Sequence, residues 1–338
     1  MSHRPAVRTS TEVSEALAEG RPVVALETAV LTHGLPREPS PRPNSLAPGH
    51  TAAGLLHGHA WNESAPCNLE AVRAVAAAVR AAGAVPASVG VVHGELVIGL
   101  DDDECAGLAL DESVKKASSR DLGPIAATGG SAGTTVAATM RACRLASPQP
   151  IRVFATGGIG GVHRGWQKRP DISADLRALA GEPVAVVASG AKVILDVAAT
   201  LEALDTLGVP VIGVGTEGMP IFTAGVDSEL APPHRLDDPA AIATACRRHW
   251  HDFGQSSGLL LANPCPSDAA ADPRRIDALV DAGLAEASSL GIDGGDVTPF
   301  LLASMVGQDD VDPLGANIAL LISNAALAAR VAVAFAAG

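Results

Sequence analysis

The sequence predicts an α/β protein, arranged as a three-layer α/β/α sandwich around a mostly parallel, mixed central sheet with a small β-hairpin appendage. Apolar runs without polar alternation recur along the chain, and segments of helical period separate them. The 338 residues, 47% of them hydrophobic and 18% charged, are enough for one large aliphatic core. We therefore expect a single α/β domain over residues 1–338, with a mobile insertion at residues 37–66.

The expected strands are short apolar runs of the kind that a parallel sheet buries on both faces, at residues 22–26, 151–155, 183–187 and 209–213. The expected helices follow the 3.6-residue period, and several end at Gly or Pro, at residues 68–82, 134–145, 191–207 and 239–251. Thr9 and Glu12 have the spacing of a capping box and predict a helix start before the first strand.

Two further segments complete the fold prediction. Residues 89–92 and 96–100 flank His93-Gly94-Glu95 and predict a hairpin, and residues 125–128 predict a weak strand. Residues 317–337 are apolar, but polar side chains interrupt them, and much of their apolar content is Ala rather than the larger Leu. They therefore predict a buried C-terminal helix rather than a membrane span.

Charge and cysteine content exclude several classes of function. With 24 Lys and Arg against 37 Asp and Glu, the net charge of -13 repels nucleic acid. The 5 cysteines are odd in number and contain no CxxC spacing, which argues against a disulfide framework and a zinc cage. The N-terminus has no apolar stretch of signal-peptide length. We expect a cytoplasmic protein with neither membrane nor nucleic acid as partner.

The insertion at residues 37–66 is rich in proline and follows no period, which indicates a loop. His50, His57, His59 and Cys67 could in principle ligate a metal there. Their spacing matches no standard site, so a solvated loop is the expected state.

Lys192 follows a buried strand and a Ser-Gly turn, in the predicted first turn of a helix. A cation beside the positive end of a helix dipole is destabilised, and apolar surroundings desolvate it. Both effects favour a neutral, nucleophilic amine that can form a Schiff base. The structural alternative is a lysine whose stem packs and whose ammonium reaches solvent.

Asp171 and Asp175 are spaced i, i+4 around Ser173, which predicts two carboxylates and a hydroxyl on one helical face. Oxygen ligands of this kind suit Mg²⁺ or Mn²⁺, which keep several waters and need few protein carboxylates. Helix capping by Asp171 or Ser173 is the structural alternative, and it accounts for one acid but not for both.

Two glycine-rich segments follow strands. Residues 154–165 contain Thr156, His163 and Arg164, but their glycine spacing is neither GxGxxG nor a P-loop. Residues 129–133 match GxSxG around Ser131, the pattern of an esterase nucleophile, with His234 or His249 as candidate bases. We prefer a helix N-terminus that holds an anion, with the Thr134 and Thr135 hydroxyls beside it.

Glu27 ends the first predicted strand. Open α/β sheets bind their ligands at the carboxyl ends of strands, and burial there would raise the pKa of a carboxyl. Glu27 is therefore a candidate general acid or base.

Together and in this order, these segments resemble the pseudouridine-5'-phosphate glycosidases, also called the indigoidine-synthase-A-like family. The matching stretches cover nearly the whole chain outside residues 37–66 and include ALETAVLTHGLP, KKASSRDL, GTTVAATM, FATGGIGGVHRG, DISADL, SGAKVILD, GVGTEGMPIF and ANIAL. The resemblance implies reversible cleavage of pseudouridine 5'-phosphate to uracil and ribose 5-phosphate. It also implies a homotrimer, a bound Mn²⁺ or other divalent cation such as Mg²⁺, and a pseudouridine kinase as metabolic partner.

The resemblance implies a role for individual residues. Lys192 matches the Schiff-base lysine, Glu27 the proton donor and Asp171 the metal ligand. The implied substrate-binding positions are Lys116, Val136, Ser173, Ala174 and Asp175, with Thr135, Thr156, His163 and Asn317 as further pocket residues.

The chain departs from the family in two places, and two alternative functions stay open. Residues 37–66 interrupt the segment after Thr32-His33-Gly34, and Ser119 stands where the family's KxSRRD pattern has an arginine. The first alternative is a serine esterase that uses Ser131. The second is a catalytically impaired phosphosugar-binding protein.

Overall fold

The computed structural model describes residues 6–167, 170–292, 297, 300 and 312–338. Within them an 11-stranded sheet runs in the order β1-β4-β3-β2-β7-β8-β13-β9-β12, with β6 joined to β3 and β5 to β6. Its strands are β1 (Val7–Thr9), β2 (Val23–Glu27), β3 (Val85–Val92), β4 (Glu95–Ile98), β5 (Lys115–Ala117), β6 (Ala132–Thr134), β7 (Val153–Ala155), β8 (Ala185–Ala188), β9 (Val211–Gly213), β12 (His234–Arg235) and β13 (Leu259–Ala262). β10 (Met219–Pro220) and β11 (Val226–Asp227) form a small antiparallel sheet.

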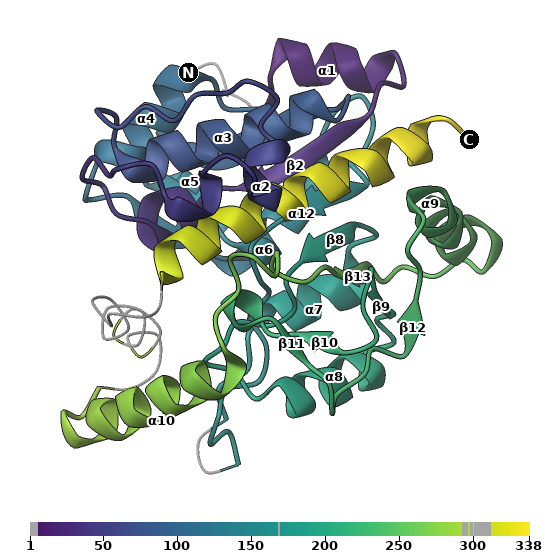
Figure 1. Ribbon diagram of the computed structural model, residues 1–338. Coiled ribbons are helices and arrows are strands. Elements are labelled where there is room, and N and C mark those ends of the chain that lie inside the picture. The colour runs from purple at the N-terminus through teal and green to yellow at the C-terminus, as the bar shows by residue number, and fades with distance from the viewer. Residues whose placement is uncertain (1–5, 168–169, 293–296, 298–299, 301–311) are drawn as a thin grey trace.

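The helices cover both faces of this sheet (Figure 1). They are α1 (Thr11–Ala18), α2 (Thr51–Gly54), α3 (Cys67–Ala81), α4 (Asp102–Leu110), α5 (Leu122–Ala127), α6 (Val136–Leu145), α7 (Ala174–Gly181), α8 (Val197–Thr206), α9 (Pro239–Arg247), α10 (Pro273–Ser289) and α12 (Pro313–Ala336). α12 packs against α3 and α9, and α6 packs against α7. The predicted α/β class, with its mixed and mostly parallel sheet, is confirmed.

The four predicted strands are confirmed as β2, β7, β8 and β9. All pair in parallel within the centre of the sheet, so their carboxyl ends meet at one edge. Sequence analysis missed β13, which lies between β8 and β9. Its four residues are all buried, as expected for a central parallel strand.

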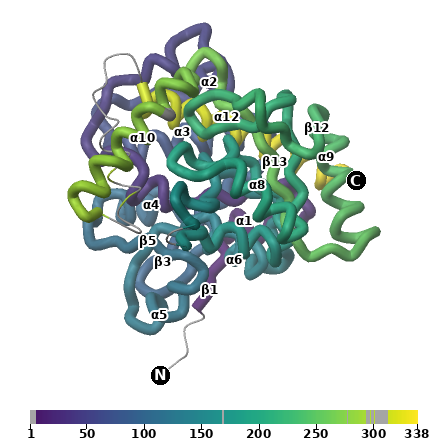
Figure 2. Tube along the Cα trace, turned by 90° about the horizontal axis from the view of Figure 1, so that it is seen from below, coloured from purple at the N-terminus to yellow at the C-terminus, as the bar shows by residue number. Residues whose placement is uncertain are grey.

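α12 is the longest helix of the described chain, and most of its residues are buried. It is long and apolar enough to span a membrane by length and composition, but 72% of its most apolar window is buried inside the protein. Both views place it beside α3 (Figures 1 and 2). The prediction of a buried C-terminal helix is therefore confirmed.

Four local predictions were wrong. Ser10, not Thr9, caps α1 by accepting the N–H of Val13. The predicted hairpin is confirmed as β3–β4, but it belongs to the central sheet rather than to an appendage. Residues 125–128, predicted as a strand, fall largely in α5. The helix predicted from 191 begins only at Val197, capped by Asp196, because residues 189–195 first pair with the loop after β7.

The insertion at residues 37–66 packs against the core. Leu46 is fully buried within a short 3-10 helix (Asn44–Leu46), and the Ser45 hydroxyl donates to the carbonyl of Gly315 in α12 over 2.8 Å. The buried Glu70 of α3 accepts the backbone N–H of Asn62 and contacts the His59 ring. No group of three or more His, Cys, Asp and Glu side chains that could hold a metal ion forms among the described residues, His50, His57, His59 and Cys67 included.

Leu46→Ala tests how firmly this segment belongs to the fold. We expect it to lower the free energy of unfolding by about 3 kcal/mol, because it leaves a cavity in the core. Urea denaturation measures this value, and Leu110→Ala, at a leucine 57% exposed, serves as control. If the segment contributed nothing to the core, both variants would stay within about 0.5 kcal/mol of the parent protein.

Candidate active site

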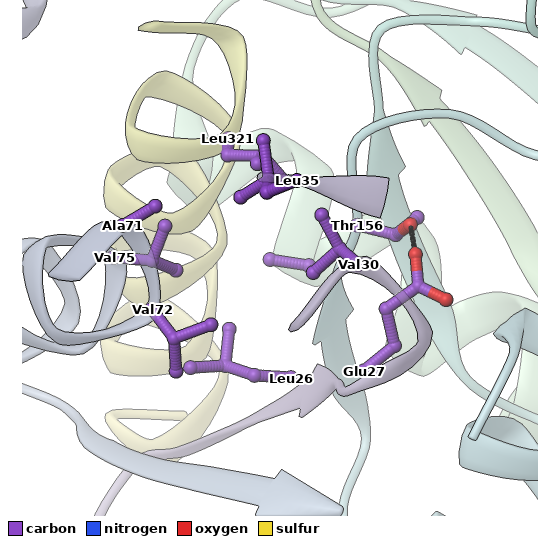
Figure 3. A pocket seen from close by; sticks show the side chains of 10 residues that line it. Leu26, Glu27, Val30, Leu35, Ala71, Val72, Val75, Thr156 and Leu321 are labelled. Carbon is purple, nitrogen blue, oxygen red and sulfur yellow. Dashed lines mark hydrogen bonds between the residues drawn. The ribbon is translucent and has the colours of Figure 1, made fainter. Parts of the chain in front are cut away.

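The candidate site forms where the carboxyl ends of β2, β7 and β8 meet. Glu27 is the last residue of β2, Thr156 follows β7, and Ser189 follows β8 on the way to Lys192. The Thr156 hydroxyl donates to Oε1 of Glu27, as the close-up shows (Figure 3). Parallel pairing of neighbouring strands thus brings together side chains that lie more than a hundred residues apart in the sequence.

Glu27, which is largely but not fully buried, borders an apolar pocket. Apolar side chains from β2, α3 and α12 line this pocket, among them Leu26, Val75 and Leu321 (Figure 3). Burial raises the pKa of Glu27, and the Lys192 cation and the Thr156 hydroxyl oppose that rise. A carboxyl with a raised pKa keeps its proton closer to neutral pH, as a proton donor requires.

Four charged groups act on one another here. The charges that influence the pKa of Glu27 are those of Lys192, Asp175 and Lys116. Desolvation and then the Lys192 cation lower the pKa of Lys116, although part of that side chain stays exposed. These interactions link Glu27 of β2 electrostatically with Lys116 of β5, Lys192 of the loop after β8 and Asp175 of α7.

His33 is a site residue that the residue-by-residue reasoning did not select. Desolvation first, then the cations of Lys116 and Arg37, lower the pKa of His33. Its Nδ1 lies 2.6 Å from the Thr32 hydroxyl. The sequence feature that could have identified His33 is its position six residues after Glu27, within the THGLP segment.

The position of Lys192 corrects the sequence prediction. Lys192 lies in the loop before α8, not in the first turn of a helix, so a helix dipole does not explain its chemistry. The loop instead extends the pairing of β7 and β8. The Ser189 N–H donates to Gly157 O over 2.9 Å, the Ile159 N–H to Gly190 O over 3.0 Å, and the Lys192 N–H to Ile159 O over 3.2 Å.

The glycines of these loops allow segments of the protein to pack closely. Gly190 has φ +70°, and a Cβ there would lie 1.9 Å from Pro220 O. A Cβ on Gly160 would lie 2.3 Å from the Ser173 hydroxyl, and one on Gly161 2.4 Å from the Thr200 hydroxyl. These glycines therefore face neighbouring protein atoms.

Gly190→Ala is expected to displace the Lys192 loop. The positive φ costs about 1–2 kcal/mol for alanine, and the clash with Pro220 adds to it. Gly165→Ala separates the two effects, because Gly165 has φ +81° but no atom within 4 Å of a Cβ. Tm and the turnover rate should both fall far more in Gly190→Ala than in Gly165→Ala. Equal losses in the two variants would contradict a role for the close approach.

Asp171, Ser173 and Asp175 do not share a helical face. The prediction that the two carboxylates and the hydroxyl lie together on one helix was therefore wrong. Ser173 is the N-cap of α7, and Ala174 is the exposed first residue of that helix. Asp171 precedes the helix, and its Oδ2 lies 3.8 Å from Nδ1 of His163. Asp175 is buried, and its carboxylate accepts the N–H of Ala137 over 3.0 Å and that of Gly160 over 2.9 Å. Asp175 thus joins α6 to the loop after β7.

The N-terminus of α6 presents polar atoms suited to an anion. Thr135 is the N-cap, Val136 the buried first residue, and the Thr135 hydroxyl is buried without a hydrogen-bond partner. The hydroxyl of Ser118, two residues after Lys116, is also buried and unpartnered. Buried polar atoms are normally paired, so two hydroxyls without a partner among the described residues, beside a helix N-terminus, suit an anion as ligand.

Asn317 lies in the first turns of α12, half-buried, two helical turns before Asn324 on the same face. Leu320 and Leu321 between them pack beside Gly157, at the carboxyl end of β7. The predicted pocket residue is therefore on the side of α12 that overlooks the strand ends.

The structure does not assemble an esterase triad around Ser131. Ser131 precedes a short strand, not a helix, and its hydroxyl accepts the N–H of His93. His249 contacts Ser257, and His234 is exposed on the edge strand β12. Neither candidate base has a recorded contact with Ser131 among the described residues.

Comparison with known proteins identifies the family. The family profile described as "Indigoidine synthase A like protein" matches residues 56–334. A pseudouridine-5'-phosphate glycosidase 2 of Rhizobium johnstonii is 45% identical over 329 residues, 97% of this chain and 96% of its own length. The chain belongs to the indigoidine synthase A-like family. A further family member of this kind, the pseudouridine-5'-phosphate glycosidase of Paracoccus denitrificans, is 44% identical over 98% of this chain and 99% of its own.

Two solved structures are similar to this chain over nearly their whole length. The prealnumycin C-glycosynthase AlnA, in complex with ribulose 5-phosphate, has a TM-score of 0.81 and 35% identity, covering 99% of this chain and 98% of that one. An indigoidine synthase A-like protein from Thermotoga maritima has a TM-score of 0.78 and 30% identity, covering 98% and 97%.

Proposed function

We propose that this protein is a pseudouridine-5'-phosphate glycosidase. The observation that carries the proposal is that the charges of Lys192 and Lys116 act on the carboxyl of Glu27, at the carboxyl end of β2, in a chain that is 41–46% identical to full-length relatives of that name. The bond in pseudouridine 5'-phosphate joins two carbons, so there is no leaving oxygen for a pair of carboxyls to protonate. A lysine amine provides another route.

In the proposed mechanism, the neutral amine of Lys192 bonds to C1 of the ribose as the C1–O4 ring bond breaks. The electron pair of that bond stays on O4, which takes up the proton that the amine loses. As the bond between C1 and the uracil carbon breaks, its electron pair leaves with uracil, and the nitrogen lone pair forms the C=N bond of a Schiff base. Glu27 delivers the proton, helped by its raised pKa. Hydrolysis of the Schiff base then frees ribose 5-phosphate and restores the amine.

The remaining residues hold the substrate. Lys116 and the N-terminus of α6, with Thr135 and Val136, bind the phosphate in this proposal, and Asp175 keeps that helix against the loop after β7. Thr156 and His163 line the ribose side, and Ser173 and Ala174 begin the helix beside it.

A divalent cation fits beside this site. Asp171 and His163 lie within 3.8 Å of each other, and carboxylate oxygen and imidazole nitrogen both suit Mn²⁺. Mn²⁺ or Mg²⁺ held by Asp171, with waters completing its shell, would orient the substrate and polarise its oxygens.

Uracil release from pseudouridine 5'-phosphate tests the proposal, measured with Mn²⁺ and with a chelator. We expect release by the metal-loaded protein and little by the chelated one. If folded protein binds ribose 5-phosphate but releases no uracil, the phosphosugar-binding alternative replaces the enzyme. Ser131→Ala should leave the rate unchanged, because Ser131 only accepts a backbone N–H.

A further inference from the structure

A buried amide on α12 joins three of the strand ends that build the site. Asn324 is fully buried, and its Nδ2 donates to the carbonyl of Thr156 over 2.8 Å. Its Oδ1 accepts the side-chain N–H of Asn263 over 2.8 Å, and its amide also contacts the Ser189 hydroxyl, with Nδ2 at 3.2 Å. Thr156, Ser189 and Asn263 are the residues that directly follow β7, β8 and β13.

These three positions lead straight to the reacting groups. Thr156 is held at its carbonyl by Asn324, and its hydroxyl donates to the carboxyl of Glu27. Ser189 is followed by Gly190, and the loop then carries Lys192. The Asn324 amide therefore acts on Glu27, the proposed proton donor, through Thr156. It acts on the Lys192 amine through Ser189 and the short, tightly packed loop that follows it.

The contact requires a side chain that both donates and accepts a hydrogen bond, as an amide does. The Thr156 carbonyl needs a donor, and the Asn263 N–H needs an acceptor, so a side chain at 324 must supply both. Every hydrogen-bond partner recorded for Asn324 among the described residues is uncharged. A buried amide that merely stabilised α12 would not need to bond three separate strand ends.

We propose that Asn324 is a positioning residue that sets the relative placement of Glu27 and Lys192, an inference that rests on the proposed function. It touches neither substrate nor reacting atoms in this assignment. Its effect is carried by the Thr156 carbonyl and by Ser189. A displacement of about 1 Å between such groups can lower a rate about 10²-fold.

Two substitutions and one control test this assignment. Asn324→Leu removes donor and acceptor at similar size, and Asn324→Asp removes only the donor while its carboxyl is ionised. We expect kcat to fall about 10²-fold in both near neutral pH, with a much smaller change in KM. Because a protonated carboxyl can donate to Thr156 O and accept from Asn263, the Asp variant should recover towards the parent rate as pH falls. The Leu variant should not.

Ser257→Ala is the matched control. Ser257 is buried at the opposite end of β13, where its hydroxyl donates to Gly208 O over 2.9 Å. This variant should lower Tm without changing kcat. If folded Asn324→Leu, checked by circular dichroism, kept a kcat within twofold of the parent protein, the positioning role would be overturned.

A second readout needs no turnover, so the inference can fail separately from the proposed function. The pKa of Glu27 can be followed by carbon-13 NMR of labelled glutamate carboxyls, in a site where Lys192, Lys116 and Asp175 are the charged neighbours. The Thr156 hydroxyl helps to lower that pKa, so Asn324→Leu should raise it and Ser257→Ala should not. An unchanged value would contradict the inference, whereas a parent protein that releases no uracil would contradict the function alone.

Discussion

Replacing Lys192 with alanine is expected to abolish turnover, with kcat lowered by about 10⁴-fold or more, because the variant has no amine to form the Schiff base. Steady-state assay of uracil release measures the loss. Reduction with borohydride in the presence of ribose 5-phosphate gives a second readout, since only a protein with the Schiff base gains the mass of the reduced sugar.

Lys115→Ala is the control for this experiment. Lys115 lies on β5 directly before Lys116, and its side chain is exposed. It should keep its rate and its trapped adduct, whereas Lys192→Ala should lose both while remaining folded. An adduct that persisted in Lys192→Ala would assign the chemistry to another amine, and Lys116 would be the first to examine.

Replacing Glu27 with glutamine is expected to lower kcat by about 10²–10⁴-fold, the usual range for loss of a general acid or base. Glutamine has nearly the same shape and can still accept from the Thr156 hydroxyl, but it cannot deliver a proton. Because Lys192 is intact, trapping with ribose 5-phosphate should continue. Glu112→Gln, at an exposed site, is the control. Loss of trapping together with turnover would show that Glu27 serves the amine rather than proton transfer.

The pH dependence of Glu27 has a definite sign. Burial raises its folded-state pKa above the unfolded value of about 4.3, so the fold favours the neutral carboxyl. Its contribution to stability is therefore fully present below the unfolded pKa and is lost as pH rises through the folded pKa. Relative to the parent protein, Tm of Glu27→Gln should rise with pH across that window. A difference that stayed constant with pH would show that the Glu27 pKa is not raised.

Sequence patterns predicted much of the fold and many of the site residues. Unbroken apolar runs gave β2, β7, β8 and β9, because a strand buried on both faces must be apolar throughout. Glu27 was selected because a carboxylate ends one of those strands. Motif resemblance supplied Lys116, Val136 and Asn317, which no local physical signal distinguished.

Short elements and loop positions were harder to predict. β13 was missed although its four buried apolar residues match β8 in length and character. Residues 191–196 read as helix because Ala, Lys, Val and Leu suit one, yet pairing with the loop after β7 keeps them extended or turned. The i, i+4 spacing of Asp171 and Asp175 implied a shared face, but the helix begins only after Ser173.

The sequence by itself determined the α/β class, the parallel strands, the buried C-terminal helix and the identity of the two proposed reacting residues, because these depend on composition, periodicity and motifs. Only the tertiary structure decided that Thr156 bonds Glu27 and that Asn324 joins three strand ends. Those contacts link residues far apart in the chain. They exist because parallel strands place their carboxyl ends side by side, and that adjacency follows from strand order in the sheet rather than from any local pattern.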